Sequence, residues 1–442
     1  MGRPHFLCLP LPIQGHVNPL MQFSLLLAKH GCKVTFVHTE FSHKRANTAG
    51  GDNKEEAQVE LVTLPDGLDP QDDRSDVAKL LLSMKSTMPA LLPKLIQDID
   101  ASDVENKITC IIVTINMGWA LEVGHKLGIK GALLCPASAT SLASAASIPK
   151  LIQDGIIDSQ GLATKKQEIQ LSPTMPKMDT AHFPWRGFKK IFFDNLVQEM
   201  QTLELGEWWL CNTTYDLEPG AFSLSPKFLP IGPLVENSNR SSFWEEDTAC
   251  LEWLDQQPAQ SVVYVSFGSL AVMDPNQFKE LALGLDLLDK PFIWVVRPSN
   301  DGKENVNAYP DDFHGSKGKI VGWAPQKKIL SHPSLACFIS HCGWNSTLEG
   351  ICAGVPFLCS PCTTDQFLNR NYICDVWKIG VGLEKDESGI VSREEIRKKV
   401  DELLVDEDIK ARSLKLKEMT IDNIQESGQS SKNLSFFMDW AK

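Results

Sequence analysis

The sequence predicts an α/β protein with two doubly wound parallel sheets, one after the other along the chain. Short apolar runs of strand length alternate with helical stretches in residues 6–136. The same alternation resumes in residues 261–361, after a polar stretch. In addition, 442 residues are too many for one compact hydrophobic core, so at least two domains are expected.

The first series opens with a strand, a turn, a helix and a second strand. The first strand is the apolar run 6–11. We expect the helix that follows to have Asn18 as its N-cap and Pro19 as its first residue, and to end at Gly31. KVTFVH then forms a strand parallel to the first, joined to it by a right-handed crossover. The runs ITCIIVT and KGALLCP are predicted as further buried strands.

The second series is equally regular. It begins with the strand SVVYVSFG and the helix PNQFKELALGLDLL, and continues with the strands PFIWVVR, GKIVGW, ACFISHC and PFLCSP. Residues 140–200 instead indicate loops and short helices, which usually carry specificity on a regular scaffold. The polar segment 236–242 is the predicted linker. Because ligands of such sheets bind beyond the carboxyl ends of the strands, the predicted site is a cleft between two facing halves.

Composition excludes several classes of function. A net charge of −13 argues against nucleic acid or an anionic membrane as a partner. The N-terminal apolar stretch is short and broken by prolines, and no run approaches the roughly 20 apolar residues of a membrane span. Twelve scattered cysteines are typical of reduced thiols in a cytoplasmic protein. No metal site is expected, because Cys359 and Cys362 lack a second pair or a histidine at ligand spacing.

The stretch HCGWNSTLEG, residues 341–350, allows two interpretations. Ser346 followed by Glu349 fits the capping box that begins a helix. Alternatively, His341, Trp344 and Asn345 crowd ahead of the helix, where free backbone N–H groups attract an anion. The first interpretation predicts that the Glu349 carboxylate turns back to the Ser346 N–H. The second predicts that it faces the cleft, and this is the outcome we expect.

A longer segment decides between them. Residues 323–366, WAPQKKILSHPSLACFISHCGWNSTLEGICAGVPFLCSPCTTDQ, closely resemble the signature of plant secondary-product UDP-glycosyltransferases, glycosyltransferase family 1. The resemblance extends to PIQGHVNP at 12–19, NTTYDLE at 212–218, IGP at 231–233 and VSFGS at 265–269. It implies the GT-B fold, in which two Rossmann-like doubly wound domains face each other across a cleft.

The resemblance also implies a division of labour between the domains. Residues 1–235 would bind the acceptor, 236–245 would link the domains, and 246–425 would bind the UDP-sugar. Residues 426–442 would form a C-terminal helix that packs back on the first domain. The implied partners are a UDP-sugar and a small acceptor molecule, with no nucleic acid and no membrane insertion, and a monomer is expected.

The family pattern assigns a role to each residue of a nucleotide-sugar site. Trp323 would stack on uracil, the Ala324 backbone would pair with its edge, and Gln326 and Glu349 would bind ribose hydroxyls. His341, Gly343, Asn345, Ser346 and Ser269 would surround the diphosphate, whereas Trp344, Asp365 and Gln366 would meet the sugar. The glutamine at position 366, the last of the signature, resembles the pattern of family members that use UDP-glucose. The helix N-terminus would stabilise departing UDP, so neither a metal nor another cofactor is implied.

His16 is the candidate general base, since the resemblance places it beside the acceptor. We expect it in the loop ahead of the helix start, where the positive end of the helix dipole keeps the imidazole neutral. It would take the acceptor's proton during one inverting attack on the anomeric carbon, giving a β-glucoside. The candidate acceptor-side residues are Gly15, Thr114, Trp119, Ser138 and Trp185.

One departure from the family bears on the acceptor. Thr114 stands where most members have an Asp behind the catalytic His, and a hydroxyl can orient an imidazole without neutralising its charge. A weaker base favours acceptors that lose a proton easily, such as phenols. The same departure leaves open transfer to carbon or nitrogen. A nucleotide-sugar-binding protein without turnover is the further alternative, against which the retained His16 argues.

Overall fold

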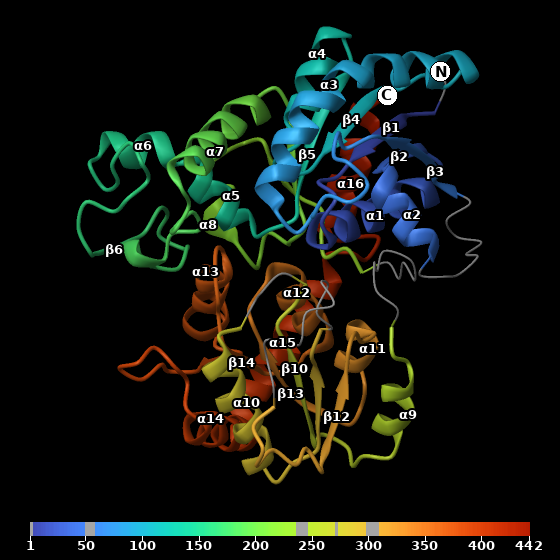
Figure 1. Ribbon diagram of the computed structural model, residues 1–442. Coiled ribbons are helices and arrows are strands. Elements are labelled where there is room, and N and C mark those ends of the chain that lie inside the picture. Colours follow the sequence, from blue (N-terminus) through green and yellow to red (C-terminus); the bar gives the residue numbers. More distant parts are fainter. Residues whose placement is uncertain (1–2, 49–57, 236–245, 270–272, 298–308) are drawn as a thin grey trace.

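The computed structural model describes residues 3–48, 58–235, 246–269, 273–297 and 309–442 (Figure 1). The expected linker 236–245 lies outside the described residues. Two parallel sheets stand on opposite sides of the molecule, one from each half of the chain (Figure 1). None of the described helices is long and apolar enough to cross a membrane.

The first sheet has the strand order β3-β2-β1-β4-β5-β8-β9, and all its pairs are parallel. Its strands are β1 (His5–Leu9), β2 (Lys33–Thr39), β3 (Glu60–Leu64), β4 (Cys110–Val113), β5 (Lys130–Cys135), β8 (Trp208–Cys211) and β9 (Phe228–Pro230). The helices of this half are α1 (Gln14–Lys29), α2 (Glu40–Thr48), α3 (Val77–Ser102), α4 (Trp119–Lys126), α5 (Ala139–Ala146), α6 (Ile148–Gln153), α7 (Lys190–Leu203) and α8 (Pro219–Phe222).

Alternate side chains of β1 pack on opposite faces of this sheet, as the two-residue strand period requires. Leu7 and Leu9 face the core that α3 and α4 cover, whereas Phe6 and Cys8 face α1. The irregular region 154–189 contributes a small antiparallel pair, β6 (Glu168–Ile169) and β7 (Met178–Asp179), and the short 3₁₀ helix η2 (Thr180–His182).

The second sheet has the order β12-β11-β10-β13-β14-β15 and is also parallel. Its strands are β10 (Val262–Ser266), β11 (Phe292–Val295), β12 (Gly318–Val321), β13 (Leu335–Ser340), β14 (Phe357–Cys359) and β15 (Gly380–Gly382). The helices around it are α9 (Ala249–Asp255), α10 (Pro275–Leu287), α11 (Gln326–Leu330), α12 (Trp344–Ala353), α13 (Gln366–Asn371), the π-helical segment η3 (Tyr372–Val376), α14 (Arg393–Val405) and α15 (Glu407–Asp422).

The last helix, α16 (Gln429–Trp440), lies against the first sheet rather than the second (Figure 1). Phe437 is fully buried, and its ring stacks on Phe6 of β1 with the centroids 5.6 Å apart. Ser430 Oγ donates to the Gly232 carbonyl at 2.6 Å. The end of the chain therefore contributes to the core of the first half.

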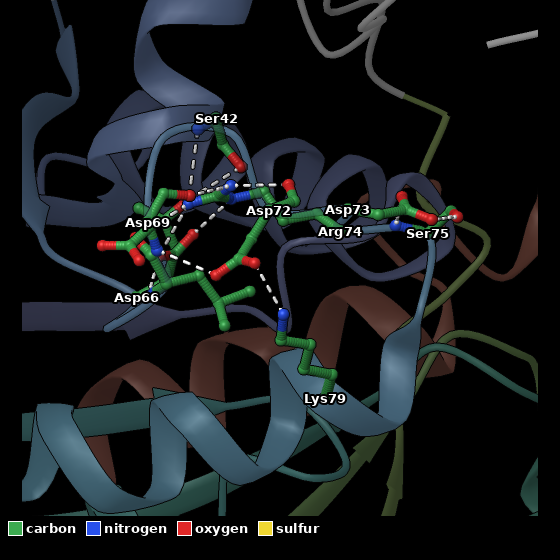
Figure 2. Close-up of polar contacts among 10 residues, drawn as sticks. Ser42, Asp66, Asp69, Asp72, Asp73, Arg74, Ser75 and Lys79 are labelled. Atoms are coloured by element: carbon green, nitrogen blue, oxygen red, sulfur yellow. Dashed lines mark hydrogen bonds and ion pairs between the residues drawn. The ribbon is translucent and has the colours of Figure 1, made fainter. Parts of the chain in front are cut away.

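The connection from β3 to α3 is held by Arg74 (Figure 2). Its guanidinium makes a bidentate pair with the Asp66 carboxylate, at 2.9 and 3.1 Å, and its Nη1 donates to the carbonyls of Asp69 and Asp72. Asp66 is only 4% exposed. The guanidinium also lies 4.2 Å from the centroid of the Phe41 ring. Because the pair is bidentate and largely dry, it fixes this connection strongly.

The start of α1 differs from the sequence prediction. The helix begins at Gln14 with Ile13 as N-cap, so Asn18 is not the cap, Pro19 lies inside the helix, and His16 is in the first turn rather than in a loop. Proline in a helix removes the hydrogen bond to the carbonyl four residues earlier, here that of Gly15. The second domain supplies a donor to that carbonyl, as described below.

Candidate active site

A cavity of about 420 Å³ lies between the two halves, at the carboxyl ends of both sheets. Its volume falls within the range typical of small-molecule sites. The first half contributes the start of α1 and the residues after β5. The second contributes the loops after β10, β12, β13 and β14. All the sugar-donor residues predicted from the sequence line it, namely Ser269, Trp323, Ala324, Gln326, His341, Gly343, Trp344, Asn345, Ser346, Glu349, Asp365 and Gln366.

The N-terminus of α12 is the centre of the second half's wall. Gly343 is its N-cap, no side chain caps it, and the first helical bond runs from Thr347 N to Gly343 O. The N–H groups of Trp344, Asn345 and Ser346 therefore have no partner within the helix. Together with the helix dipole, they suit a negatively charged group in the cavity.

This boundary corrects the capping-box interpretation. Ser346 is the third residue of α12, not its cap. Its Oγ accepts from Gln326 Nε2 at 2.9 Å, and the same amide nitrogen donates to Glu349 Oε2 at 2.7 Å. Glu349 is thus engaged with α11 at the wall of the cavity, as expected, and burial raises the pKa of its carboxyl.

Tyr264 completes this network and was not predicted from the sequence. Its hydroxyl donates to Gln326 Oε1 at 3.1 Å, and the side chain is 1% exposed. The Gln326 amide is therefore held at both ends. The continuously apolar strand SVVYVSFG gave no indication of a partner for the Tyr264 hydroxyl, because that partner is decided by packing.

Two glycines make room for the His341 ring. A Cβ on Gly268 would lie 2.6 Å from His341 Nε2, and one on Gly343 only 2.4 Å from it. Burial lowers the pKa of His341 to about 4, so the ring is neutral at physiological pH. Its buried Nδ1 has no hydrogen-bond partner among the described residues. Cys342, which lies between His341 and Gly343 in the chain, has a φ of 64°. Such strained conformations cluster at functional turns.

Asp365 and Gln366 approach the cavity from the start of α13. Gln366 Oε1 accepts from the N–H groups of Cys362 and Thr363, at 2.8 and 3.0 Å, which leaves the amide Nε2 for a ligand. Asp365 Oδ2 accepts from Asn369 Nδ2 at 2.9 Å, and burial raises the pKa of its carboxyl. Asn369 also donates to the Cys342 carbonyl. This buried residue, missed in the sequence, joins the α13 end of the site to the loop ahead of α12.

The first half brings His16 to the same cavity. His16 Nδ1 lies 2.9 Å from Thr114 Oγ1, and burial lowers the pKa of the imidazole to about 4. Thr114 is fully buried at the end of β4, and its Oγ1 also accepts from Leu11 N at 2.9 Å. Gly15 lines the cavity, and its carbonyl, left without a helical partner by Pro19, accepts from Asn345 Nδ2 at 3.2 Å. This bond ties the first turn of α1 directly to α12.

Comparison with known proteins settles the family. The family model described as "UDP-glucoronosyl and UDP-glucosyl transferase" matches residues 177–426, more than half of the chain. A second model, "Glycosyltransferase, N-terminal domain", matches residues 5–65. UDP-glycosyltransferase 83A1 of Arabidopsis thaliana is 43% identical over 464 residues, which cover 100% of this chain and 97% of that protein. The chain belongs to this family of UDP-glycosyltransferases.

A second relative and a solved structure also match nearly the whole chain. The 7-deoxyloganetic acid glucosyltransferase of Catharanthus roseus is 31% identical, and the match covers 99% of this chain and 97% of that protein. The solved structure of Phytolacca americana UGT2, complexed with UDP-2-fluoro-glucose and pterostilbene, superposes with a TM-score of 0.82 at 26% identity and covers 100% of this chain and 99% of that one. The fold is therefore the expected GT-B fold.

Four of the five predicted acceptor residues do not line the cavity of this UDP-glycosyltransferase, whereas Gly15 does. Thr114 is fully buried behind His16. Trp119 is 5% exposed and belongs to the core under α4. Trp185 is 2% exposed, stacks on Phe183 and donates its indole N–H to the Gly161 carbonyl. Ser138 is buried as the N-cap of α5, where it accepts from Ser141 N. The sequence position of each of these residues suggested an acceptor contact. A buried aromatic ring is explained equally well by core packing, and a serine by capping a helix.

The indole of Trp344 is engaged away from the predicted sugar contact, which stays a prediction for the backbone of this residue. Trp344 borders the cavity, but it is 3% exposed, and its indole N–H donates to the Asn212 carbonyl of the first half at 2.9 Å. From the first half, Ile13, Gln14, Pro136 and Ala137 line the cavity instead. Pro136 ends the predicted strand KGALLCP and Ala137 follows it, so the rule that sites lie beyond carboxyl ends would have selected this point of the chain.

Proposed function

We propose that this chain is an inverting glucosyltransferase that moves glucose from UDP-glucose to a small lipophilic, phenolic plant metabolite to give a β-glucoside. The observation that carries the proposal is the position of His16. Its imidazole faces the same cavity as the open N-terminus of α12 and the polar ends of Asp365 and Gln366. A base, an anion site and hydroxyl-binding groups thus surround one space.

The UDP-sugar half of the mechanism uses the second domain. The free N–H groups at the start of α12 would hold the diphosphate and stabilise the charge that builds up as UDP departs. Trp323, Gln326 and Glu349 would hold uridine. We propose that no metal or other cofactor takes part, because the helix N-terminus offsets the charge of the leaving group.

Glucose is the proposed sugar on two grounds. The amide Nε2 of Gln366 and the Asp365 carboxylate offer one hydrogen-bond donor and one acceptor to neighbouring sugar hydroxyls. The named relative from Catharanthus roseus is a glucosyltransferase, and the Phytolacca americana structure holds a fluorinated UDP-glucose. The pterostilbene in that structure also supports a phenolic acceptor for this chain.

His16 would take the acceptor's proton on Nε2, since Nδ1 is occupied by Thr114. Burial lowers its pKa to about 4, so the ring is neutral at physiological pH and ready to accept a proton, but it is a weak base. A carboxylate in the place of Thr114 could only accept and would therefore hold the proton on Nδ1. A hydroxyl can also donate to Nδ1, which puts the proton on Nε2 and removes the base.

Because the imidazole proton can sit on either nitrogen, His16 is a weaker base, which favours acceptors with acidic hydroxyls. The second candidate function is transfer to an electron-rich aromatic carbon or to nitrogen, since such transfer needs less help from a base. We propose the cytoplasm as the compartment. The described cysteines are free and most are buried, which fits a reducing environment.

The test is incubation of the protein with UDP-glucose and a panel of phenols, with products identified by mass and by acid treatment. Acid-labile glucosides with the β-configuration support the proposal. Acid-stable products support transfer to carbon instead. Binding of UDP-glucose without any product supports a non-catalytic binding protein, and products formed only with another UDP-sugar overturn the choice of glucose.

A further inference from the structure

The two domains are joined by a buried hydrogen bond beside the sugar end of the cavity. Thr140 Oγ1 in α5 lies 2.7 Å from the hydroxyl of Tyr372, the first residue of η3. Both side chains are fully buried. Neither residue lines the cavity, but Pro136 and Ala137 line it just before Thr140, and Gln366 lines it six residues before Tyr372 on the opposite wall.

On the first domain, Thr140 is held by Glu218. The Glu218 carboxylate accepts from the N–H groups of Ala139 and Thr140, at 3.1 and 2.8 Å, at the N-terminus of α5. It is fully buried; burial raises its pKa, and hydrogen bonds that include the Thr140 hydroxyl stabilise its charged form. Glu218 ends the stretch NTTYDLE, to which the sequence assigns no chemical role. Its carboxylate fixes the end of α5 at which Thr140 meets the other domain.

On the second domain, Tyr372 fixes the far end of α13. Its ring stacks on Trp377 with the centroids 4.8 Å apart, and the Trp377 indole N–H donates to the Leu217 carbonyl, next to Glu218. The other end of the six-residue α13 carries Asp365 and Gln366. Because α13 and η3 are continuous, the position of the Tyr372 hydroxyl bears on the position of both sugar-facing side chains.

We propose that Tyr372 and Thr140 form an interdomain latch that sets the width of the cleft at its sugar end and so aligns the sugar with the acceptor. Both are positioning residues, since they act through α13 and α5 without contact to the cavity. The inference rests on the proposed placement of the sugar at Asp365 and Gln366. The latch controls transfer and not nucleotide binding, because the residues that would hold uridine and diphosphate lie on α11, on α12, in the loops ahead of them and after β10, and none lies on α13 or η3.

Four variants test the latch: Tyr372→Phe, Thr140→Val, the double variant, and Thr140→Ser, which keeps a hydroxyl. Tyr309→Phe is the control for loss of a tyrosine hydroxyl away from the cavity, since this partly exposed residue packs on Phe278 of α10 and Trp294 of β11. The kcat for transfer is measured with the best substrate pair of the wild type, and the dissociation constant of UDP by calorimetry. Hydrogen exchange of residues 139–146 is followed with and without UDP-glucose.

We expect kcat to fall about fivefold in each single variant, the usual effect of one lost hydrogen bond, and no further in the double variant. Thr140→Ser and Tyr309→Phe should keep the wild-type kcat, and the affinity for UDP should stay unchanged throughout. UDP-glucose should slow hydrogen exchange in α5 of the wild type but not of Tyr372→Phe.

Several outcomes overturn the latch: an unchanged kcat with unchanged exchange, losses that multiply in the double variant, an equal loss in Tyr309→Phe, or UDP affinity that falls with kcat. The exchange experiment needs no acceptor, so it tests the latch even if phenols are not substrates. Conversely, a protein that glucosylates phenols with a normal kcat in Tyr372→Phe retains the proposed function and loses only the latch.

Discussion

The imidazole of His16 and the hydroxyl of Thr114 form a buried pair, with Nδ1 2.9 Å from Oγ1. Thr114 also accepts from the backbone of Leu11, so one of its lone pairs is already used. What remains on this oxygen is one lone pair and one proton, and either can meet the imidazole. The protonation pattern of His16 is therefore less tightly determined than it would be beside a carboxylate.

Replacing Thr114 with Asp should raise kcat on aliphatic alcohol acceptors by about tenfold or more, and change phenol transfer much less. The carboxylate accepts from both Leu11 N and His16 Nδ1, holds the proton on Nδ1 and stabilises the imidazolium. Steady-state kinetics with matched alcohols and phenols measure the effect. Thr114→Ser is the control that keeps the hydroxyl. Rates in Thr114→Asp that are unchanged from the wild type for every acceptor would contradict the role of this position.

His16→Ala should lower kcat by about 10²- to 10⁴-fold for acceptors whose hydroxyl must lose a proton, the usual contribution of a general base. The affinity for UDP should not change, because the residues that would hold UDP lie in the second domain. Phenols with electron-withdrawing substituents should lose least. A variant that keeps more than a tenth of the wild-type kcat on unactivated phenols would exclude His16 as the base.

Glu349→Ala should raise the KM for UDP-glucose about tenfold while kcat changes little. A carboxylate that binds ribose hydroxyls acts equally in the ground state and the transition state, and a hydrogen bond to a charged group contributes about 1.5–3 kcal/mol. The comparison uses a donor analogue without ribose hydroxyls, for which wild type and variant should have the same KM. A KM raised equally for both donors would indicate a purely structural role for Glu349.

Buried histidines should make stability depend on pH. Burial lowers the pKa of His38 to about 4 from an ordinary value of 6.5, so the unfolded state binds the proton more tightly. Its contribution to stability is present above pH 6.5 and is lost as the pH falls from 6.5 toward 4, by up to about 1.4 kcal/mol per pH unit. The buried carboxyls Glu199 and Glu218, with raised pKa values, respond in the opposite sense.

The contribution of His38 is isolated by comparing urea unfolding of the wild type and His38→Gln between pH 7 and pH 4.5. The difference in the free energy of unfolding between them should shift steadily in favour of the variant as the pH falls. A constant difference would show that His38 is not a neutral buried group in the folded state.

Arg74→Ala should destabilise the protein by about 3 kcal/mol, because it leaves the buried Asp66 carboxylate without its partner. The control is Lys94→Ala, which removes an exposed ion pair with Asp98 on α3 and should cost less than about 0.5 kcal/mol. Urea unfolding measures both. Equal losses in the two variants would contradict the importance of the bidentate pair in the connection from β3 to α3.

Local sequence patterns predicted much of this structure. Short apolar runs that alternate with helical stretches predicted the parallel strands, because a strand buried on both faces is continuously apolar. The segment 323–366 predicted the residues that line the cavity from the second domain through its resemblance to a family signature. The helix starts were predicted less well. Asn18 and Ser346 are suitable caps in isolation, but α1 begins at Gln14 and α12 at Trp344, and neither helix start carries a side-chain cap.

Only the tertiary structure decided how the two domains meet. Whether Trp119, Trp185 and Ser138 face a ligand or the core depends on the direction of the side chain, which residue type does not determine. The partners Asn345 and Gly15, Trp344 and Asn212, and Thr140 and Tyr372 are separated by 330, 132 and 232 positions in the chain. The sequence alone determined the fold, the family and the residues that line the cavity from the second domain, since these depend on local pattern. The acceptor wall and the bonds across the cleft depend on contacts between distant segments, which form only when both sheets pack.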